Sequence, residues 1–163
     1  MACAAVTLAS GCGSVDGSPA AASLGGAQFD PCTIPDEAIS AAGADPGTKE
    51  AGIFGVDLKD WNVCSWDSSW YFLSILSTDH TFNEIKENPQ SLDFKSVDIG
   101  RRDAVSYLDI SDTAKDVCDV AFPSSQGVIV IRISTKGTAE RMEDPCAVAV
   151  RAGVSLGAAL PDR

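Results

Sequence analysis

The chain has 163 residues, of which 45% are hydrophobic, and carries a formal net charge of -11 at pH 7. This size and hydrophobic content suit one globular domain with a modest core rather than two independent cores. The 12 Lys and Arg residues are scattered, so the chain lacks the clustered positive charge that nucleic acid requires, and we exclude nucleic acid as a partner. An acidic body is also repelled by anionic lipid headgroups, so we expect any membrane attachment to depend on a covalent or inserted anchor.

Residues 1–12 resemble the end of a bacterial lipoprotein signal peptide. The stretch MACAAVTLASG is apolar or small, and it ends at Cys12. In such signals a small residue precedes a cysteine whose thiol receives a diacylglyceryl group. The aliphatic residue Leu8 lies one place earlier than usual and no Lys or Arg precedes the apolar run, so we expect a truncated signal whose start lies upstream. The alternative is a disordered start in which Cys12 is incidental.

The resemblance predicts attachment to the membrane through a lipid anchor on Cys12. A membrane helix needs about 20 apolar residues, and no segment of the chain supplies them. Two or more acyl chains give durable attachment, because each buried methylene contributes about 0.8 kcal/mol. Residues 13–28 are rich in Gly, Ala and Ser and carry one charge, Asp16, which predicts a flexible linker.

The first half of the body predicts two helices around a hairpin. Thr33 as a cap, Pro35 in the first turn and Gly43 at the end indicate a short amphipathic helix. Residues 62–66 and 70–78 are aromatic and β-branched, and they indicate a hairpin. A second helix of about two turns is expected from the cap region at 79–81 to the residue before Pro89.

The second half predicts four strands and a closing helix. The segment SVDIGRRDAVSYLDIS alternates on both sides of Gly100 and Arg101, and DVCDVAFPSSQGVIVIRIST does so around 123–127. Asp144 as a cap, Pro145 at the first helical position and apolar residues at helical spacing from Val148 to Leu160 predict the final helix. Residues 29–163 are therefore expected to form a single α+β domain, an antiparallel β-sheet covered by helices.

The four cysteines of the body predict disulfides rather than a metal site. They form an even set without a CxxC pair, and His80 is the only histidine, which disfavours zinc. Widely spaced cysteines in a small domain fit an oxidising compartment outside the cytoplasm. The chain contains neither GxGxxG nor GxxxxGK[ST], so we expect no nucleotide cofactor, and no metal or other cofactor is expected. The cysteines are Cys32, Cys64, Cys118 and Cys146.

Several motifs together resemble a known family. They are FDPC (29–32), Gly43 after the expected helix, CSW (64–66), IGRRDAV (99–105), the strand-borne Cys118 and DPCAVAV (144–150). Over residues 29–163 the chain resembles the actinobacterial lipoproteins of the domain of unknown function 3558 family. The resemblance implies a secreted protein, anchored by lipid to the extracytoplasmic face of the cell membrane, as found in mycobacteria and their relatives. The element order is also similar to the PsbP-like sandwich and to the extracellular sensor domain of the mycobacterial kinase PknH, an analogy that does not transfer function.

Four cysteines allow three pairings, and the sequence alone does not choose among them. We favour Cys32 with Cys64 and Cys118 with Cys146. Each of these pairs would tie a helix start to a nearby strand and close a loop of about thirty residues, which stabilises by roughly 3 to 4 kcal/mol in the chain-entropy model.

The sequence contains no recognisable catalytic pattern, so we expect a protein that is not an enzyme. A Ser-His-Asp hydrolase would have to use His80, which lies in an expected turn, and the GxSxG motif is absent. Carboxylates are close together at Asp57 and Asp60 and again at 140–144, as expected by chance in an acidic protein. The spaced DxDxDG loop of calcium sites is also absent.

One aromatic cluster indicates a ligand site. Trp61, Trp70 and Tyr71 lie close together in the sequence, and aromatic faces bind apolar, sugar or lipid ligands. The neighbouring Trp66 is expected to pack over the disulfide of Cys64. Arg101 and Arg102 at a turn are candidates for binding an anionic partner, although such a pair is more often solvated.

These observations favour a non-enzymatic binding or sensing module, monomeric, that presents its domain to an envelope lipid, a glycan or a protein. The alternative is an accessory or assembly protein that binds a membrane transporter or envelope enzyme, and an envelope hydrolase is least favoured. A deep pocket lined by Trp61, Trp70 and Tyr71 would support the first hypothesis, and a flat apolar patch would support the second.

Overall fold

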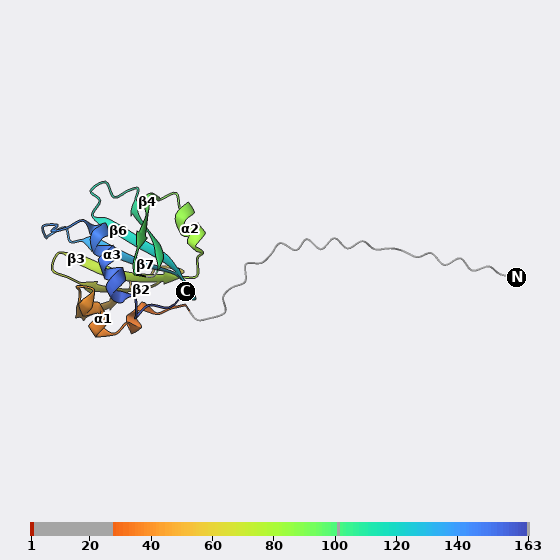
Figure 1. The fold of residues 1–163 in the computed structure, drawn as a ribbon, viewed down its shortest axis with the longest axis horizontal. Helices are drawn as coiled ribbons and strands as arrows, with labels where there is room; N and C mark the ends of the chain where they lie inside the picture. The colour runs from red at the N-terminus through yellow and green to blue at the C-terminus, as the bar shows by residue number, and fades with distance from the viewer. Residues whose placement is uncertain (2–27, 101, 163) are drawn as a thin grey trace.

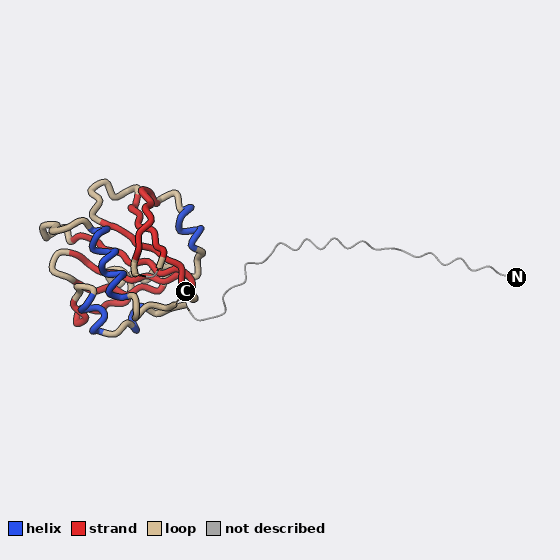
Figure 2. Tube along the Cα trace, in the orientation of Figure 1, coloured by secondary structure: helices blue, strands red, loops and turns tan. Residues whose placement is uncertain are grey.

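The computed structural model of the protein describes Met1, residues 28–100 and residues 102–162. These residues form one seven-stranded antiparallel sheet with helices against it (Figures 1 and 2), as the sequence predicts. The predictions for Cys12, for most of the linker and for Arg101 lie outside the described residues. Along the chain the elements are η1 (Pro31–Thr33), α1 (Asp36–Ala41), β1 (Asp45–Ala51), β2 (Asn62–Asp67), β3 (Tyr71–Thr78), α2 (Phe82–Glu87), β4 (Ser91–Asp98), β5 (Asp103–Asp109), β6 (Val117–Ser124), β7 (Gly127–Thr135) and α3 (Pro145–Leu156).

Hairpin connections build most of the sheet, whose strand order is β1-β2-β3-β7-β6-β5-β4. The predicted pairs β2 with β3, β4 with β5 and β6 with β7 are all present and antiparallel. The turn of the last pair is tight: Gly127 has φ +105°, and a Cβ there would lie 2.1 Å from the carbonyl oxygen of Thr78. Only glycine fits this position, because it tolerates both the positive φ and the close approach.

Three details of the sequence prediction are wrong. Strand β1 was not predicted, because Pro46 and Gly47 indicate a loop; the strand lies at the edge of the sheet, where a proline costs no ladder hydrogen bond. Thr33 does not cap α1: it ends η1, and α1 begins after Pro35. The last helix ends at Leu156, four residues before the predicted end.

The helix caps explain why α2 and α3 begin where they do. In α2 the Thr81 hydroxyl accepts from the amide of Glu84, and the Glu84 side chain accepts from the amide of Thr81, a reciprocal capping box. In α3 the Asp144 carboxylate accepts from the amide of Ala147, and Pro145 occupies the first turn, where its missing N–H is not needed.

The two faces of the sheet differ in what covers them. We call the face under α1 and α3 the covered face; Figure 1 shows both helices over the same side of the sheet, with α2 apart from them. Its core combines strand residues such as Leu73, Ile75 and Ile131 with Ile39 of α1 and Leu156 of α3, all with no more than a trace of exposure. At about 1.5 to 3 kcal/mol for each buried large aliphatic side chain, this core supplies most of the driving force for folding.

Both disulfides lie on the covered face, and both follow the favoured pairing. Cys32–Cys64 joins η1 to β2, and Cys118–Cys146 joins β6 to the first turn of α3. Trp66, two residues after Cys64, is buried in the same apolar cluster as Cys64. The bridges therefore fix both ends of the helical layer to the sheet.

Candidate functional site

The opposite face of the sheet, which we call the open face, carries a continuous row of polar side chains. The strand register places one such residue beside the next across six strands. From β1 to β5 the row is Glu50, Ser65, Ser74, Arg132, Asp119 and Tyr107. Because side chains of a strand alternate between faces, the same strands supply the apolar core behind this row.

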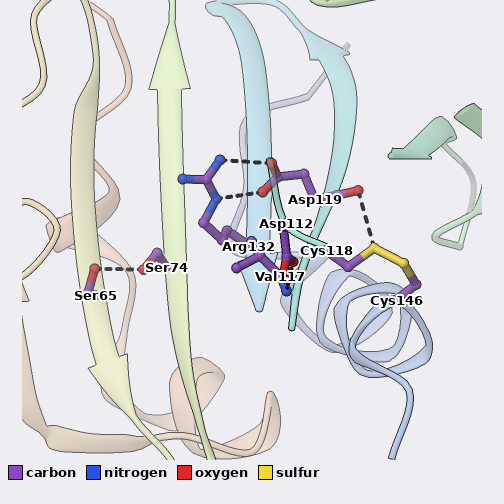
Figure 3. Close-up of polar contacts among 8 residues, drawn as sticks. All are labelled: Ser65, Ser74, Asp112, Val117, Cys118, Asp119, Arg132 and Cys146. Atoms are coloured by element: carbon purple, nitrogen blue, oxygen red, sulfur yellow. Dashed lines mark hydrogen bonds and ion pairs between the residues drawn. A yellow bond between two sulfur atoms is a disulfide. The ribbon is translucent and has the colours of Figure 1, made fainter. Parts of the chain in front are cut away.

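The centre of the row is an ion pair between Arg132 of β7 and Asp119 of β6. Arg132 Nε donates to Asp119 Oδ1 at 2.8 Å, and Nη2 donates to Oδ2 at 2.8 Å, a bidentate geometry (Figure 3). The side chain of Asp119 is 4% exposed and that of Arg132 is 30% exposed. Burial opposes the charge of Arg132, but the hydrogen bonds and attraction of Asp119 outweigh it and raise the pKa of the guanidinium. The guanidinium of Arg132 therefore stays positively charged at neutral pH.

Successive residues of β6 point to opposite faces of the sheet. Cys118 bonds to Cys146 of α3, whereas Asp119, the next residue, points toward Arg132 (Figure 3). On the other side of Arg132 the hydroxyls of Ser65 and Ser74 share a hydrogen bond of 2.8 Å (Figure 3). The polar row is thus internally hydrogen-bonded at its centre, as buried polar groups require.

Tyr107 ends the row next to Asp119. It is 8% exposed, and its ring lies 5.2 Å from that of Phe94. Burial, and secondarily the negative charge of Asp119, raise the pKa of the Tyr107 hydroxyl. The structure gives this hydroxyl no hydrogen bond to another described residue, and its raised pKa keeps it protonated and able to donate.

Two cavities on this face lie next to the paired residues Ser74 and Arg132, one lined by Arg132 and the other by Ser74. The first, which we call the Arg132 cavity, measures about 180 Å³. The second, the Phe54 cavity, measures about 40 Å³ and lies toward β1. The Arg132 cavity is lined by Leu58, Trp61, Leu76, Ile85, Asn88, Gln90, Ser91, Tyr107, Asp109, Asp119, Val130 and Arg132. The Phe54 cavity is lined by Thr48, Glu50, Ile53, Phe54, Ser65, Asp67, Phe72, Ser74 and Ser134.

The structure separates the three aromatic residues predicted to form one ligand site. Trp61 lines the Arg132 cavity, with its ring 6.1 Å from that of His80. Trp70 and Tyr71 lie in the core of the covered face, in edge contact at 5.0 Å, and the Tyr71 hydroxyl donates to the carbonyl of Gly43. Closeness in sequence did not place them together, because the chain crosses from one face to the other between them. Only Trp61 remains a ligand-site candidate.

Arg102, predicted as a turn residue for an anionic partner, is instead bound to the end of the chain. Its guanidinium donates to the carbonyls of Gly157, Leu160 and Pro161 and lies 5.4 Å from the ring centroid of Phe122. These carbonyls follow α3 and have no helical donor of their own. The side chain therefore holds the C-terminal segment on the sheet.

Two of the carboxylates near residue 140, Glu143 and Asp144, have structural partners. Arg151 donates two hydrogen bonds to Glu143, at 2.6 and 2.8 Å, and these lower the pKa of Glu143. Asp144 caps α3. His80 lies 3.9 Å from Glu84 at the start of α2. The lowered pKa of Glu143 is the opposite of the raised carboxylate pKa that a general acid requires.

The sequence analysis missed Arg132, Asp119 and Tyr107. A signal for the first two was present: each is a lone charge inside an apolar strand, in VIVIRIST and VCDVAF. Charged residues are almost never buried unless they are paired, so each implied a partner. The partner itself depends on the register of β6 with β7, which the sequence does not contain.

The described part of the chain holds no cluster of three or more His, Cys, Asp or Glu residues arranged for a metal ion. Within the same residues, no helix is long and apolar enough to cross a membrane. In comparison with known proteins, the family model described as "Protein of unknown function (DUF3558)" matches residues 5–157. No curated protein and no solved structure matches the chain.

Proposed function

The chain belongs to the DUF3558 family of proteins of unknown function, and from this premise we propose that it is a non-enzymatic module that binds or senses a ligand at its open face. The observation that carries the proposal is the Arg132–Asp119 pair at the centre of that face, between two cavities. A buried ion pair adds little stability compared with well-packed apolar residues of similar size. Stability alone therefore does not explain why this pair is present. A concave, partly apolar surface with a few fixed polar groups is the usual form of a ligand site.

The proposal places this module outside the cytoplasm, in an actinobacterial cell envelope. We propose that Cys12 carries the lipid and that the domain stands at the outer face of the plasma membrane. Two disulfides support export, because they persist in oxidising compartments. The family resemblance of the cysteine motifs supports the same location.

Replacing Cys12 by Ser, in the gene with its complete upstream signal, tests the anchor. The variant is expected in the soluble extracytoplasmic fraction, whereas wild type stays with membranes. Cys3→Ser is the matched control, since Cys3 lies in the same stretch and is not preceded by the lipoprotein pattern. Retention of the Cys12→Ser protein in membranes would contradict the anchor.

Native mass spectrometry of the protein purified from its own envelope tests the binding function. We expect a bound small molecule whose removal shifts the amide signals of residues 119 and 132 in NMR spectra. A clean ligand-free mass, together with no shift on the open face when envelope extract is added, would contradict a binding module.

A second candidate function, an accessory protein for an envelope transporter or enzyme, rests on a separate observation. The loop between β1 and β2 exposes three apolar side chains beside the open face: Phe54 at 68%, Val56 at 60% and Leu58 at 36%. Contiguous exposed apolar side chains often mark protein contacts. Cross-linking from a photoreactive residue at position 56 in intact cells would capture one defined protein if this function holds, and a ligand-free mass would then be expected.

A further inference from the structure

The lining of the Arg132 cavity combines two kinds of side chain. Trp61, Leu76 and Val130 are apolar, whereas other lining residues carry planar polar groups and hydroxyls. Trp61 lines the cavity and is only half-buried, so part of its side chain remains exposed. The site therefore suits a ligand that has both an apolar surface and many hydroxyl or amide groups.

The charges of the cavity disfavour an anion. The positive charge of Arg132 is matched by Asp119 in bidentate contact. Asp109 adds a further negative charge: hydrogen bonds from the hydroxyl and amide of Ser111 lower its pKa, so it is ionised at neutral pH. An incoming phosphate or carboxylate would meet a net negative site, in a protein whose total charge is -11.

Several polar groups of the lining have no partner among the described residues. These include the Gln90 side-chain amide, the Ser91 hydroxyl and the Tyr107 hydroxyl, and Arg132 Nη1 is free of the two bonds to Asp119. The lining thus offers both donors and acceptors. A sugar hydroxyl both donates and accepts, so the hydroxyls of a sugar ring can hydrogen-bond to the donors and to the acceptors of the lining. An ester offers only acceptors and an ammonium group only donors.

The volume limits the ligand to one ring. At about 180 Å³ the cavity is smaller than the roughly 300 to 1,000 Å³ of pockets for drug-sized ligands. It is also open to solvent at the rim beside Asn88 and Gln90, which are exposed, so a ring inside can continue into a longer chain outside.

We propose that the Arg132 cavity binds one neutral sugar ring, free or at the end of an envelope glycan, with the ring against Trp61 and its hydroxyls toward Tyr107, Ser91 and Gln90. This inference rests on the proposed binding function and names its ligand class. Tyr107 and Trp61 then determine affinity, and Arg132 with Asp119 forms the fixed floor of the site.

NMR titration of the full, disulfide-bonded chain tests the proposal. The probes are glucose, galactose, mannose and their methyl glycosides, which imitate a glycan end, with glucuronate and glucose 6-phosphate as anionic comparators. At least one neutral probe is expected to shift the indole signal of Trp61 and the amide of residue 107 saturably, with a Kd on the order of 1 mM, while the anionic probes bind more weakly. A better response to the methyl glycoside than to the free sugar would identify the glycan end as the source.

Two variants and a control sharpen the test. Tyr107→Phe removes one hydroxyl with almost no change of shape and should weaken binding about tenfold. Trp61→Ala removes the apolar wall and should abolish measurable binding. Ser134→Ala, in the Phe54 cavity, should leave the Kd unchanged.

The proposal is overturned if no neutral sugar binds at concentrations up to about 50 mM, far above the expected Kd, or if Tyr107→Phe binds as tightly as wild type. If the sugars fail while a molecule from the envelope still shifts residues 119 and 132, only the sugar assignment falls. If neither binds, the proposed function falls with it.

Discussion

The covered face and the open face are built from alternate residues of the same strands, yet they have different tasks. In β7, Ile131 and Ile133 are fully buried under α3, while Arg132 between them points to the opposite side and pairs with Asp119. In β6, Cys118 is bonded to α3 and Asp119 faces the cavity. The covered face is apolar and held by disulfides. The open face combines the polar row and the two cavities with a second, smaller buried apolar cluster that includes Leu76, Val130 and Ile85 of α2.

Because of this difference, single substitutions should be able to change the stability of the domain and its ligand binding separately. Changes on the covered face should lower the free energy of unfolding and affect binding only by unfolding the protein. Changes in the polar row should affect binding at a smaller cost in stability. The following predictions test this separation, from the largest expected effect to the smallest.

Removal of the disulfide Cys118–Cys146, by replacing both residues with Ala, should cost roughly 3 to 4 kcal/mol in the free energy of unfolding. Its loop of 28 residues restricts the unfolded chain, and its loss frees α3 from β6. Denaturant unfolding followed by circular dichroism measures the change. Cys12→Ser is the control and should unfold like wild type; an equal loss in that control, or free thiols at positions 118 and 146 of the unreduced wild type, would refute the account.

Ile133→Ala should cost about 3 kcal/mol, because it opens a cavity in the covered core. The neighbouring Ser134→Ala, on the open face, should change stability by less than about 0.5 kcal/mol. Thermal and denaturant unfolding of the two variants compare the faces one residue apart. Similar losses in both would mean that the two faces do not differ as described.

Arg132→Met should cost about 2 to 3 kcal/mol, because it leaves the buried carboxylate of Asp119 without its partner. Asp119→Leu should cost less, since the Arg132 side chain is 30% exposed and its guanidinium can be hydrated. Unfolding curves of the two single variants give the order. The reverse order would show that Asp119, not Arg132, is the solvated partner.

Acid should weaken the contact of Glu143 with Arg151 by a small amount. The folded pKa of Glu143 lies below its ordinary value of 4.5, so the contribution is present above that value and is lost as the pH falls through the folded pKa. When the pH is lowered from about 4.5 to 3, the free energy of unfolding of Glu143→Gln should therefore fall by less than that of wild type. Glu140→Gln, which changes a carboxylate without an ion pair in the described part of the chain, should follow the wild-type curve; if Glu143→Gln follows it as well, the contact contributes nothing.

The sequence predicted those parts of the fold that depend on local pattern. Strand and turn patterns predicted three hairpins, the cap region at 79–81 predicted the start of α2, and Asp144 with Pro145 predicted the start of α3. Strand β1 was missed because its polar, proline-containing segment is held by pairing with β2 rather than by its own propensity.

The site was less predictable, because it depends on contacts between distant residues. Trp61 was identified, but Trp70 and Tyr71 were assigned to the same site because they are near in sequence, and the structure buries them on the other face. Arg132 meets Asp119 through the register of two strands, and Arg102 meets carbonyls 55 to 59 positions away. Residue type indicated that these charges needed partners but did not identify the partners.

The most direct test of the open face as a ligand site is the double variant Asp119→Leu with Arg132→Met, examined by unfolding and by native mass spectrometry of the protein from its own envelope. Replacing a buried ion pair as a whole by apolar residues of similar size is often neutral or stabilising. We predict a domain within about 1 kcal/mol of wild-type stability that no longer carries the ligand. A stable double variant that retains the ligand would contradict the account.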